Sequence, residues 1–161
     1  MGAHDALGVF SDYQDVAAAG ASDNTIDLEQ SSPKIGVGQH APYLCIRCAL
    51  ASTTEADSLS IEFQTDADDG AGAPAGTWTN VAFMPLAGAA GAELTGTDAR
   101  LKTGGWIYRG QLPYDITNRH VRLYYNNTAS TGTIYVDAWL SDGPASTFRG
   151  SQVIYSNVGQ P

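Results

Sequence analysis

Cys45 and Cys48 form a Cys-x-x-Cys pair, a spacing that binds zinc in some proteins and exchanges disulfides in others. A zinc ribbon needs a second pair of ligands, and the sequence contains no other cysteine. A redox pair sits at the N-terminus of a helix, whereas residues 43–50 alternate like a strand. Positions i and i+3 of a strand point to opposite faces, so we expect one thiol in the core, one on the other face, and no bond between them.

The run Asp66-Ala67-Asp68-Asp69-Gly70 begins like the calcium-binding loop of an EF hand. That loop requires Gly at its sixth position and Glu at its twelfth, where this sequence has Ala71 and Thr77. The EF-hand pattern therefore fails. Weak Ca²⁺ binding by the carboxylates of Asp66 to Asp69 stays open, but the favoured interpretation is a solvated turn, and we predict no metal site.

Motifs for catalysis are missing from the sequence. The three histidines, His4, His40 and His120, are widely spaced, and no Gly-x-Ser-x-Gly elbow, phosphate-binding loop or dinucleotide fingerprint accompanies them. The 17 Asp and Glu residues leave a glycosidase pair open by number alone, but nothing selects two of them. We predict a non-enzymatic protein with no catalytic residues and no cofactor. A hydrolase with an unrecognised site is the least favoured alternative.

Some of the aromatic side chains are candidates for a surface that contacts another molecule. Trp78 and Trp106 open predicted strands and are expected in the core. Trp139 alternates away from the apolar residues of its own strand and shares a face with Tyr135 and Asp137. A Tyr-Asp-Trp stripe on an outer face is either a subunit contact, which we favour, or a surface that binds a ligand such as a sugar.

Alternation of apolar and polar residues is the dominant signal in the chain. Residues 43–50 place Leu44, Ile46, Cys48 and Leu50 on one face. Residues 126–132 are rich in turn-forming residues and join two strongly alternating segments, so we expect a hairpin there. A turn at residues 85–92 is the one helix candidate. Strands are predicted at residues 43–50, 58–64, 120–125 and 133–140, and weaker strands at residues 24–28, 77–83 and 105–111.

Seven or eight short strands with polar turns predict an all-β fold, an antiparallel β-sandwich or jelly roll with extended N- and C-terminal arms. We divide the chain into an arm at residues 1–20, the sandwich at residues 21–140, and an arm at residues 141–161. The second arm carries apolar residues, including Phe148, Val153 and Tyr155. Such residues pack either on their own domain, the commoner outcome, or on a neighbouring subunit.

The formal net charge of −9, with only 8 Lys and Arg, disfavours binding to nucleic acids and to anionic membranes. No run approaches the ~20 apolar residues that a membrane span needs. The first residues contain neither a basic nor an apolar region of a signal peptide. We expect a soluble protein made in a cytoplasm, where two reduced cysteines are ordinary.

An ordered series of short matches identifies a resemblance to a known family. The matches are Phe-Ser-Asp-Tyr-Gln at residues 10–14, Ala-Ser-Asp-Asn-Thr-Ile-Asp-Leu at residues 21–28, Ile-Gly-Val-Gly at residues 35–38, Ile-Glu-Phe-Gln-Thr-Asp at residues 61–66, and Arg-His-Val-Arg-Leu-Tyr-Tyr at residues 119–125. In order and spacing, the chain resembles the jelly-roll capsid cement proteins of tailed bacteriophages, typified by the Bordetella phage cement protein. The resemblance covers residues 10–140; the last twenty residues look longer than the family's usual ending.

The resemblance implies a structural protein without catalysis. Such proteins bind the outer surface of the phage head as homo-oligomers, here a dimer or trimer, and stabilise contacts between major capsid subunits. It thus implies a virion protein assembled in the bacterial host cytoplasm, with the major capsid protein and itself as partners. The alternative is a carbohydrate-binding jelly-roll module of a phage tail or secreted protein. The residues that we predict as subunit or capsid contacts are Tyr135, Asp137, Trp139, Phe148, Val153 and Tyr155.

Overall fold

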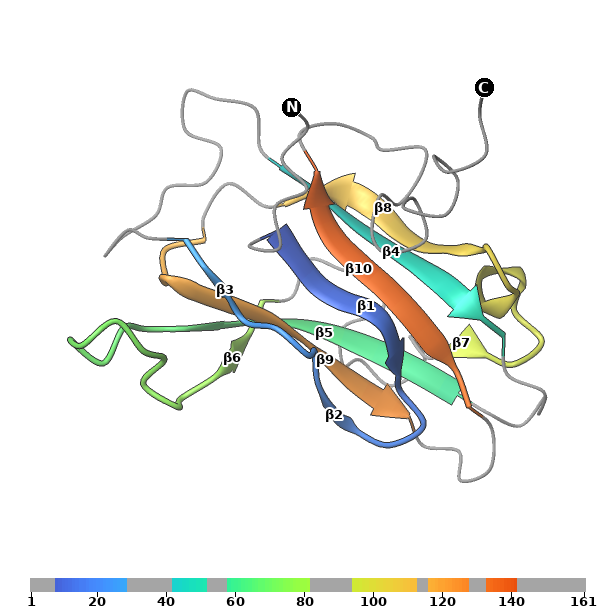
Figure 1. Ribbon diagram of the computed structural model, residues 1–161, viewed down its shortest axis with the longest axis horizontal. Coiled ribbons are helices and arrows are strands. Elements are labelled where there is room, and N and C mark those ends of the chain that lie inside the picture. Colours follow the sequence, from blue (N-terminus) through green and yellow to red (C-terminus); the bar gives the residue numbers. More distant parts are fainter. Residues whose placement is uncertain are drawn as a thin grey trace, which may run out of the picture.

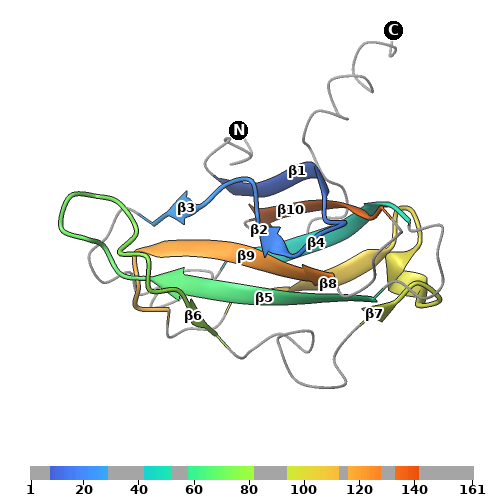
Figure 2. The same ribbon diagram turned by 90° about the horizontal axis from the view of Figure 1, so that it is seen from below.

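The computed structural model describes residues 8–28, 42–51, 58–81, 94–112, 116–127 and 133–141, and these residues form two β-sheets packed face to face (Figures 1 and 2). Every strand pairing is antiparallel, and a 3₁₀ turn at Ala99–Leu101 is the only helical element of more than one residue in these ranges. The all-β sandwich predicted from alternation is confirmed. Within the described ranges, no helix is long and apolar enough to cross a membrane.

Each sheet is built from strands that lie far apart in the sequence. Sheet A has the order β1-β10-β4-β8, with bounds β1 Val9–Asp15, β10 Tyr135–Ser141, β4 Tyr43–Leu50 and β8 Trp106–Gln111. Sheet B has the order β2-β9-β5-β6, with β3 also paired to β9 and β7 to β5. Its bounds are β2 Gly20–Ala21, β9 His120–Asn127, β5 Ser58–Asp66, β6 Thr79–Asn80, β3 Ile26–Asp27 and β7 Leu94–Thr95.

The core lies between the sheets because the inward positions of the central strands are aliphatic or aromatic. Leu44 and Ile46 of β4 are completely buried, as are Ile61 and Phe63 of β5. Phe10 of β1 meets Phe63 edge to face, with ring centroids 6.2 Å apart, so one aromatic pair joins the two layers. These contacts account for the four strong strands, which match the expected positions to within two residues. In the described part of the weaker strands 24–28 and 77–83, the structure has β3 and β6, of two residues each.

The predicted hairpin at residues 126–132 is wrong. β9, which precedes this segment, belongs to sheet B, and β10, which follows it, belongs to sheet A. Turn-forming residues indicate that the chain reverses or changes direction, but they do not determine whether the flanking strands pair. Here the two strands lie in different layers. The predicted helical turn at residues 85–92 lies outside the described residues.

Residues 9–15, which lie within the predicted N-terminal arm, form strand β1 beside β10 (Figure 1). The weak alternation of this segment has a physical cause, because the pairing register of β1 shifts between Val9 and Ser11 and again between Ser11 and Gln14. Irregularities of this kind interrupt the two-residue period on which strand prediction depends. β2 was missed for a different reason, since two residues are too short to show a period.

Candidate contact surface

The outer face of sheet B is covered by polar side chains that bind one another. The Arg122 guanidinium lies 4.1 Å from the centre of the Trp78 ring, and Arg122 Nε donates to Gln64 Oε1 at 2.8 Å. Asn126 Nδ2 donates to Glu62 Oε1 at 3.3 Å. Trp78, expected in the core, therefore packs against a charged side chain on the outer face. Neither of the exposed large hydrophobic side chains among the described residues belongs to this sheet.

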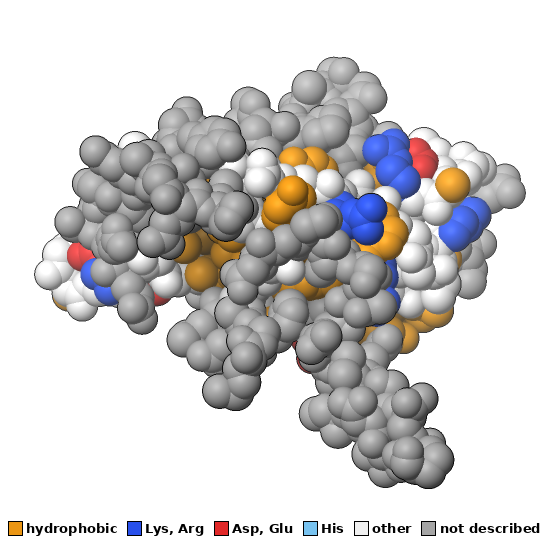
Figure 3. All heavy atoms as spheres, turned by 90° about the horizontal axis from the view of Figure 1, so that it is seen from above, with side chains coloured by type: hydrophobic (Ala, Val, Ile, Leu, Met, Phe, Trp, Pro, Cys, Tyr) orange, Lys and Arg blue, Asp and Glu red, His pale blue; other side chains and the backbone are white. Residues whose placement is uncertain are grey.

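The outer face of sheet A carries a second apolar cluster. Cys45 and Trp139 are completely buried there, with Val9, Tyr43 and Trp106 packed against them. The Trp106 and Trp139 rings lie 5.7 Å apart, so Trp106 packs outside the main core in which it was expected. Viewed from above in Figure 3, the side on which β4 and β8 lie in Figure 1, hydrophobic side chains adjoin Lys and Arg side chains.

The two cysteines lie as predicted, one on each face of sheet A. Cys48 belongs to the main core and Cys45 to the second cluster, and neither of the two forms a disulfide. Burial raises the pKa of the Cys48 thiol to about 11, with a further contribution from the Asp137 carboxylate. A thiol with so high a pKa is protonated at neutral pH and is a poor nucleophile or metal ligand.

The Tyr135-Asp137-Trp139 stripe lies on the face that alternation predicted, but most of it is not surface. Asp137 and Trp139 are completely buried, because the second apolar cluster and neighbouring polar groups cover them, and only Tyr135 stays partly accessible. Neither Asp137 nor Trp139 can therefore touch a partner directly. The other predicted contact residues, Phe148, Val153 and Tyr155, lie outside the described residues.

Asp137 holds two neighbouring strands through its two carboxylate oxygens. Arg47 Nη2 of β4 donates to Oδ2 at 2.7 Å, and the backbone N–H of Tyr13 in β1 donates to Oδ1 at 2.9 Å. Arg47 is 20% exposed, whereas Asp137 is 0% exposed. A buried carboxylate is stable only when such donors replace water, so Asp137 acts as a structural link between β1, β10 and β4.

Tyr13 has a backbone conformation that is unusual for its residue type. Its φ is +54°, the left-handed region that favours glycine, yet its side chain is 44% exposed. The ring stacks on Tyr135, with centroids 4.4 Å apart and planes 21° apart. The hydrogen bond to Asp137 and this stacking together hold Tyr13 in its conformation.

Leu50 lies beside Tyr135 because of a β-bulge in β4. Tyr135 pairs with Leu50 while the next residue of β10 pairs with Cys48, so β4 has one extra residue at this point. The bulge shifts Leu50 out of the alternation that predicted it in the core, and its side chain is 40% exposed. Tyr13 and Leu50 are the exposed large hydrophobic residues among those described, and both adjoin Tyr135. We call Tyr13, Leu50 and Tyr135 the tyrosine patch.

A buried polar network fixes β1 behind the patch. Ser11 Oγ donates to Gln14 Oε1 at 2.6 Å and lies 2.7 Å from the Tyr125 hydroxyl. Since the single hydroxyl hydrogen of Ser11 goes to Gln14, Tyr125 is the donor in the second bond. Gln14 Nε2 in turn donates to the Ala21 carbonyl at 2.9 Å. The Ser-Asp-x-Gln sequence at residues 11–14 therefore connects β1 of sheet A to β2 and β9 of sheet B.

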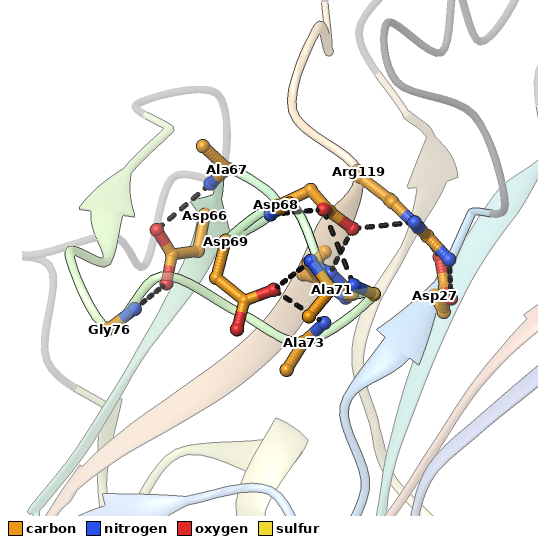
Figure 4. A network of polar contacts seen from close by, with 12 residues as sticks. Asp27, Asp66, Ala67, Asp68, Asp69, Ala71, Ala73, Gly76 and Arg119 are labelled. Carbon is orange, nitrogen blue, oxygen red and sulfur yellow. Dashed lines mark hydrogen bonds and ion pairs between the residues drawn. The ribbon is translucent and has the colours of Figure 1, made fainter.

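The carboxylates of residues 66–69 organise the loop that follows β5 and projects beyond the sheets (Figures 1 and 2). Asp66 is completely buried, and its oxygens accept hydrogen bonds from the backbone N–H groups of Ala67, Gly76 and Thr77 and from the Thr77 hydroxyl (Figure 4). Burial at this position was not expected, because the sequence favoured a solvated turn. Asp66 closes the base of the loop.

Two further carboxylates hold the tip of this loop. Asp69 Oδ1 accepts from the N–H groups of Ala71 and Ala73, and Asp68 Oδ1 accepts from that of Gly70 at 2.6 Å. Gly70 has a φ of +90°, which explains why a glycine stands in this turn. These oxygens bind backbone groups, and among the described residues no three His, Cys, Asp or Glu side chains gather into a metal-binding group.

Arg119 anchors the loop to β3, as Figure 4 shows. Its Nε and Nη2 donate to the two oxygens of Asp27 at 2.6 and 2.7 Å, and its Nη1 donates to Asp68. Burial opposes ionisation of Asp68, but the N–H groups of Gly70 and Gly72 and the Arg119 charge lower the pKa of its carboxyl below the usual value. His120, buried beneath, has its Nε2 3.6 Å from Asp68 Oδ2. These contacts tie the projecting loop to β3 and β9.

Comparison with known proteins adds one match. A family model described as Bbp16 matches residues 10–137. A search of curated proteins finds no match. The matched range begins in β1 and ends in β10, and it contains the whole tyrosine patch together with Arg47 and Asp137.

Proposed function

Because the chain belongs to the Bbp16 family, a Bordetella phage protein family, we propose that it is a structural protein of the phage particle, a cement protein of the head. In this role it binds the outer surface of the capsid and stabilises contacts between major capsid subunits. The protein acts by binding alone and catalyses no reaction. Its partners are the major capsid protein and other copies of itself.

The observation that carries this proposal is the tyrosine patch. Tyr13 has a strained backbone, which is held by a hydrogen bond to the buried carboxylate of Asp137. Its side chain is nevertheless 44% exposed, beside Tyr135. Folding alone does not explain why a strained residue carries an exposed aromatic ring. Exposed, well-ordered aromatic residues are typical of protein interfaces. The carboxylates that might have formed a reactive site instead bind backbone groups of their own loop. These features support a protein that makes contacts.

The carbohydrate-binding alternative was centred on Trp139. That ring is completely buried and cannot stack on a sugar, so no specific observation favours this alternative. The two rings of the tyrosine patch, Tyr13 and Tyr135, stack on each other.

The proposal is tested by adding the purified protein to expanded phage heads that lack it. We expect saturable co-sedimentation with the heads, no binding to free capsid subunits, and an increase in the temperature at which the heads break. Because a ligand that binds only the assembled state stabilises that state, the temperature should rise with the concentration of protein added. Heads that neither bind the protein nor gain heat resistance would rule out the cement function.

A further inference from the structure

We propose that the tyrosine patch docks onto a basic surface of the capsid subunit, with Tyr13 as its central contact. This inference rests on the proposed function and names the surface and the chemistry of the partner. Three observations carry it: the order imposed on Tyr13, the strain retained there, and the charges that surround the patch.

Tyr13 is ordered before any partner arrives. Its backbone N–H is bound to Asp137 at 2.9 Å, and its ring is stacked at 4.4 Å on Tyr135, which belongs to the adjacent strand. Because the backbone and the ring of Tyr13 are already held in place, the side chain loses little conformational entropy when a partner binds. Large aromatic side chains presented in this way are the residues that contribute most to protein interfaces.

The strain at Tyr13 indicates selection for the side chain itself. At a φ of +54°, a residue with a Cβ is disfavoured relative to glycine, because the Cβ comes too close to the following carbonyl oxygen. Folding alone would favour Gly or Asn at this position. Tyrosine is present instead, and its ring points to the outer face and is 44% exposed. A contact surface explains why an aromatic ring is kept where the backbone disfavours it.

The charges beside the patch are negative. Asp15 pairs directly with Tyr135 and is exposed, and Asp12, also exposed, precedes Tyr13. Two cations among the described residues bind within the protein: Arg47 binds Asp137, and Lys102 donates to the carbonyl of Gly96. The patch is thus an apolar centre beside carboxylates on a chain of net charge −9, which a basic protein surface complements.

Tyr13→Gly is the variant that tests the contact, because glycine accepts the backbone conformation and removes only the ring. We expect its affinity for expanded heads to fall at least about tenfold, as expected for a side chain contributing ~1.4 kcal/mol or more. Tyr13→Phe, which keeps the ring, should bind more tightly than Tyr13→Gly. The matched control is Tyr124→Ala, a half-buried tyrosine on the outer face of sheet B, whose affinity should be unchanged.

Asp15→Asn tests the chemistry of the partner. Asparagine still accepts the hydrogen bond from the Ala17 N–H that Asp15 accepts at 2.9 Å, so the turn after β1 is preserved. We expect binding to heads to weaken as salt concentration rises, and to do so less steeply for this variant than for the unmodified protein. Binding that strengthens with salt, or an identical salt dependence of the variant, would show that the partner surface is not basic.

The outcomes separate the two proposals. If the unmodified protein binds heads and Tyr13→Gly binds equally well while its fold is intact by circular dichroism, the cement function stands and the tyrosine patch is not the contact. Loss of binding by Tyr124→Ala alone would instead place the contact on sheet B. If the unmodified protein does not bind heads, the proposed function and this inference both fail.

Discussion

A single carboxylate, that of Asp137, determines the geometry of three neighbouring strands. It is removed from water completely, a change that costs several kcal/mol unless donors replace the lost hydration. Arg47 and the Tyr13 N–H are those donors, at 2.7 and 2.9 Å. The Tyr13 bond joins β1 to β10 and holds the backbone of Tyr13, and the Arg47 bond joins β4 to β10. The ion pair and the exposed tyrosine patch therefore share one carboxylate.

Asp137→Asn should destabilise the protein by about 2–4 kcal/mol, because it leaves the Arg47 charge without its partner in a largely buried position. The matched control is Asp98→Asn, which removes the charge from an exposed pair with Arg100 but keeps the oxygen that accepts from the Arg100 N–H. We expect that control to cost about 1 kcal/mol or less. Urea unfolding measures both, and equal effects would contradict a structural role for the Asp137 pair.

At the scale of elements, the loop that follows β5 shows how side chains can replace a regular hydrogen-bond ladder. The isolated bridge between Asp68 and Pro74 provides little pairing, and the carboxylates of Asp66, Asp68 and Asp69 bind backbone N–H groups instead. The Asx-type bonds made by aspartate side chains are well suited to this task. Arg119 then ties the loop to Asp27 of β3. A projecting loop thereby becomes a defined element.

Asp66→Ala should destabilise the protein by about 2–4 kcal/mol and speed amide hydrogen exchange throughout residues 67–77, because three backbone N–H groups and one hydroxyl lose a buried acceptor. Asp69→Ala is the comparison, since Asp69 is exposed and binds only the N–H groups of Ala71 and Ala73. We expect a loss of about 1 kcal/mol or less there, with faster exchange confined to the tip. Exchange that stays slow in Asp66→Ala would disprove this account.

On the scale of the whole molecule, β1 is part of the sandwich. Phe10 and Ser11 are completely buried, one in the core between the sheets and the other in the network with Tyr125 of sheet B. β1 also covers one edge of β10. The segment therefore contacts both layers, and the predicted N-terminal arm at residues 1–20 does not describe residues 9–15.

Deleting residues 1–15 should abolish cooperative folding, because it opens the space filled by Phe10 and exposes the edge of β10. The smaller change Phe10→Ala should cost about 3–5 kcal/mol, as expected for emptying a core position of this size. Thermal unfolding monitored by near-ultraviolet circular dichroism checks both variants. A truncated protein that melts cooperatively at the original temperature would show that β1 is dispensable.

The sequence alone determined the fold class, the strong strands and the faces of the two cysteines. Alternation is a local property, and a strand with one buried face must carry it, so residues 43–50 predict β4 without reference to anything else. The ordered matches beginning at residue 10 likewise led to a phage protein family without structural information. The failure of the EF-hand pattern was also visible in the residue types.

Only the tertiary structure decided which outward residues are surface. Trp139 and Asp137 alternate outward, yet neighbouring strands bury both, because a sheet face is covered by side chains distant in sequence. Leu50 leaves the core because β4 bulges against β10, and Tyr13 is exposed because Asp137, 124 residues away, binds its backbone. Register, bulges and long-range hydrogen bonds arise only when strands pair, so the tyrosine patch could not be found from the two-residue period.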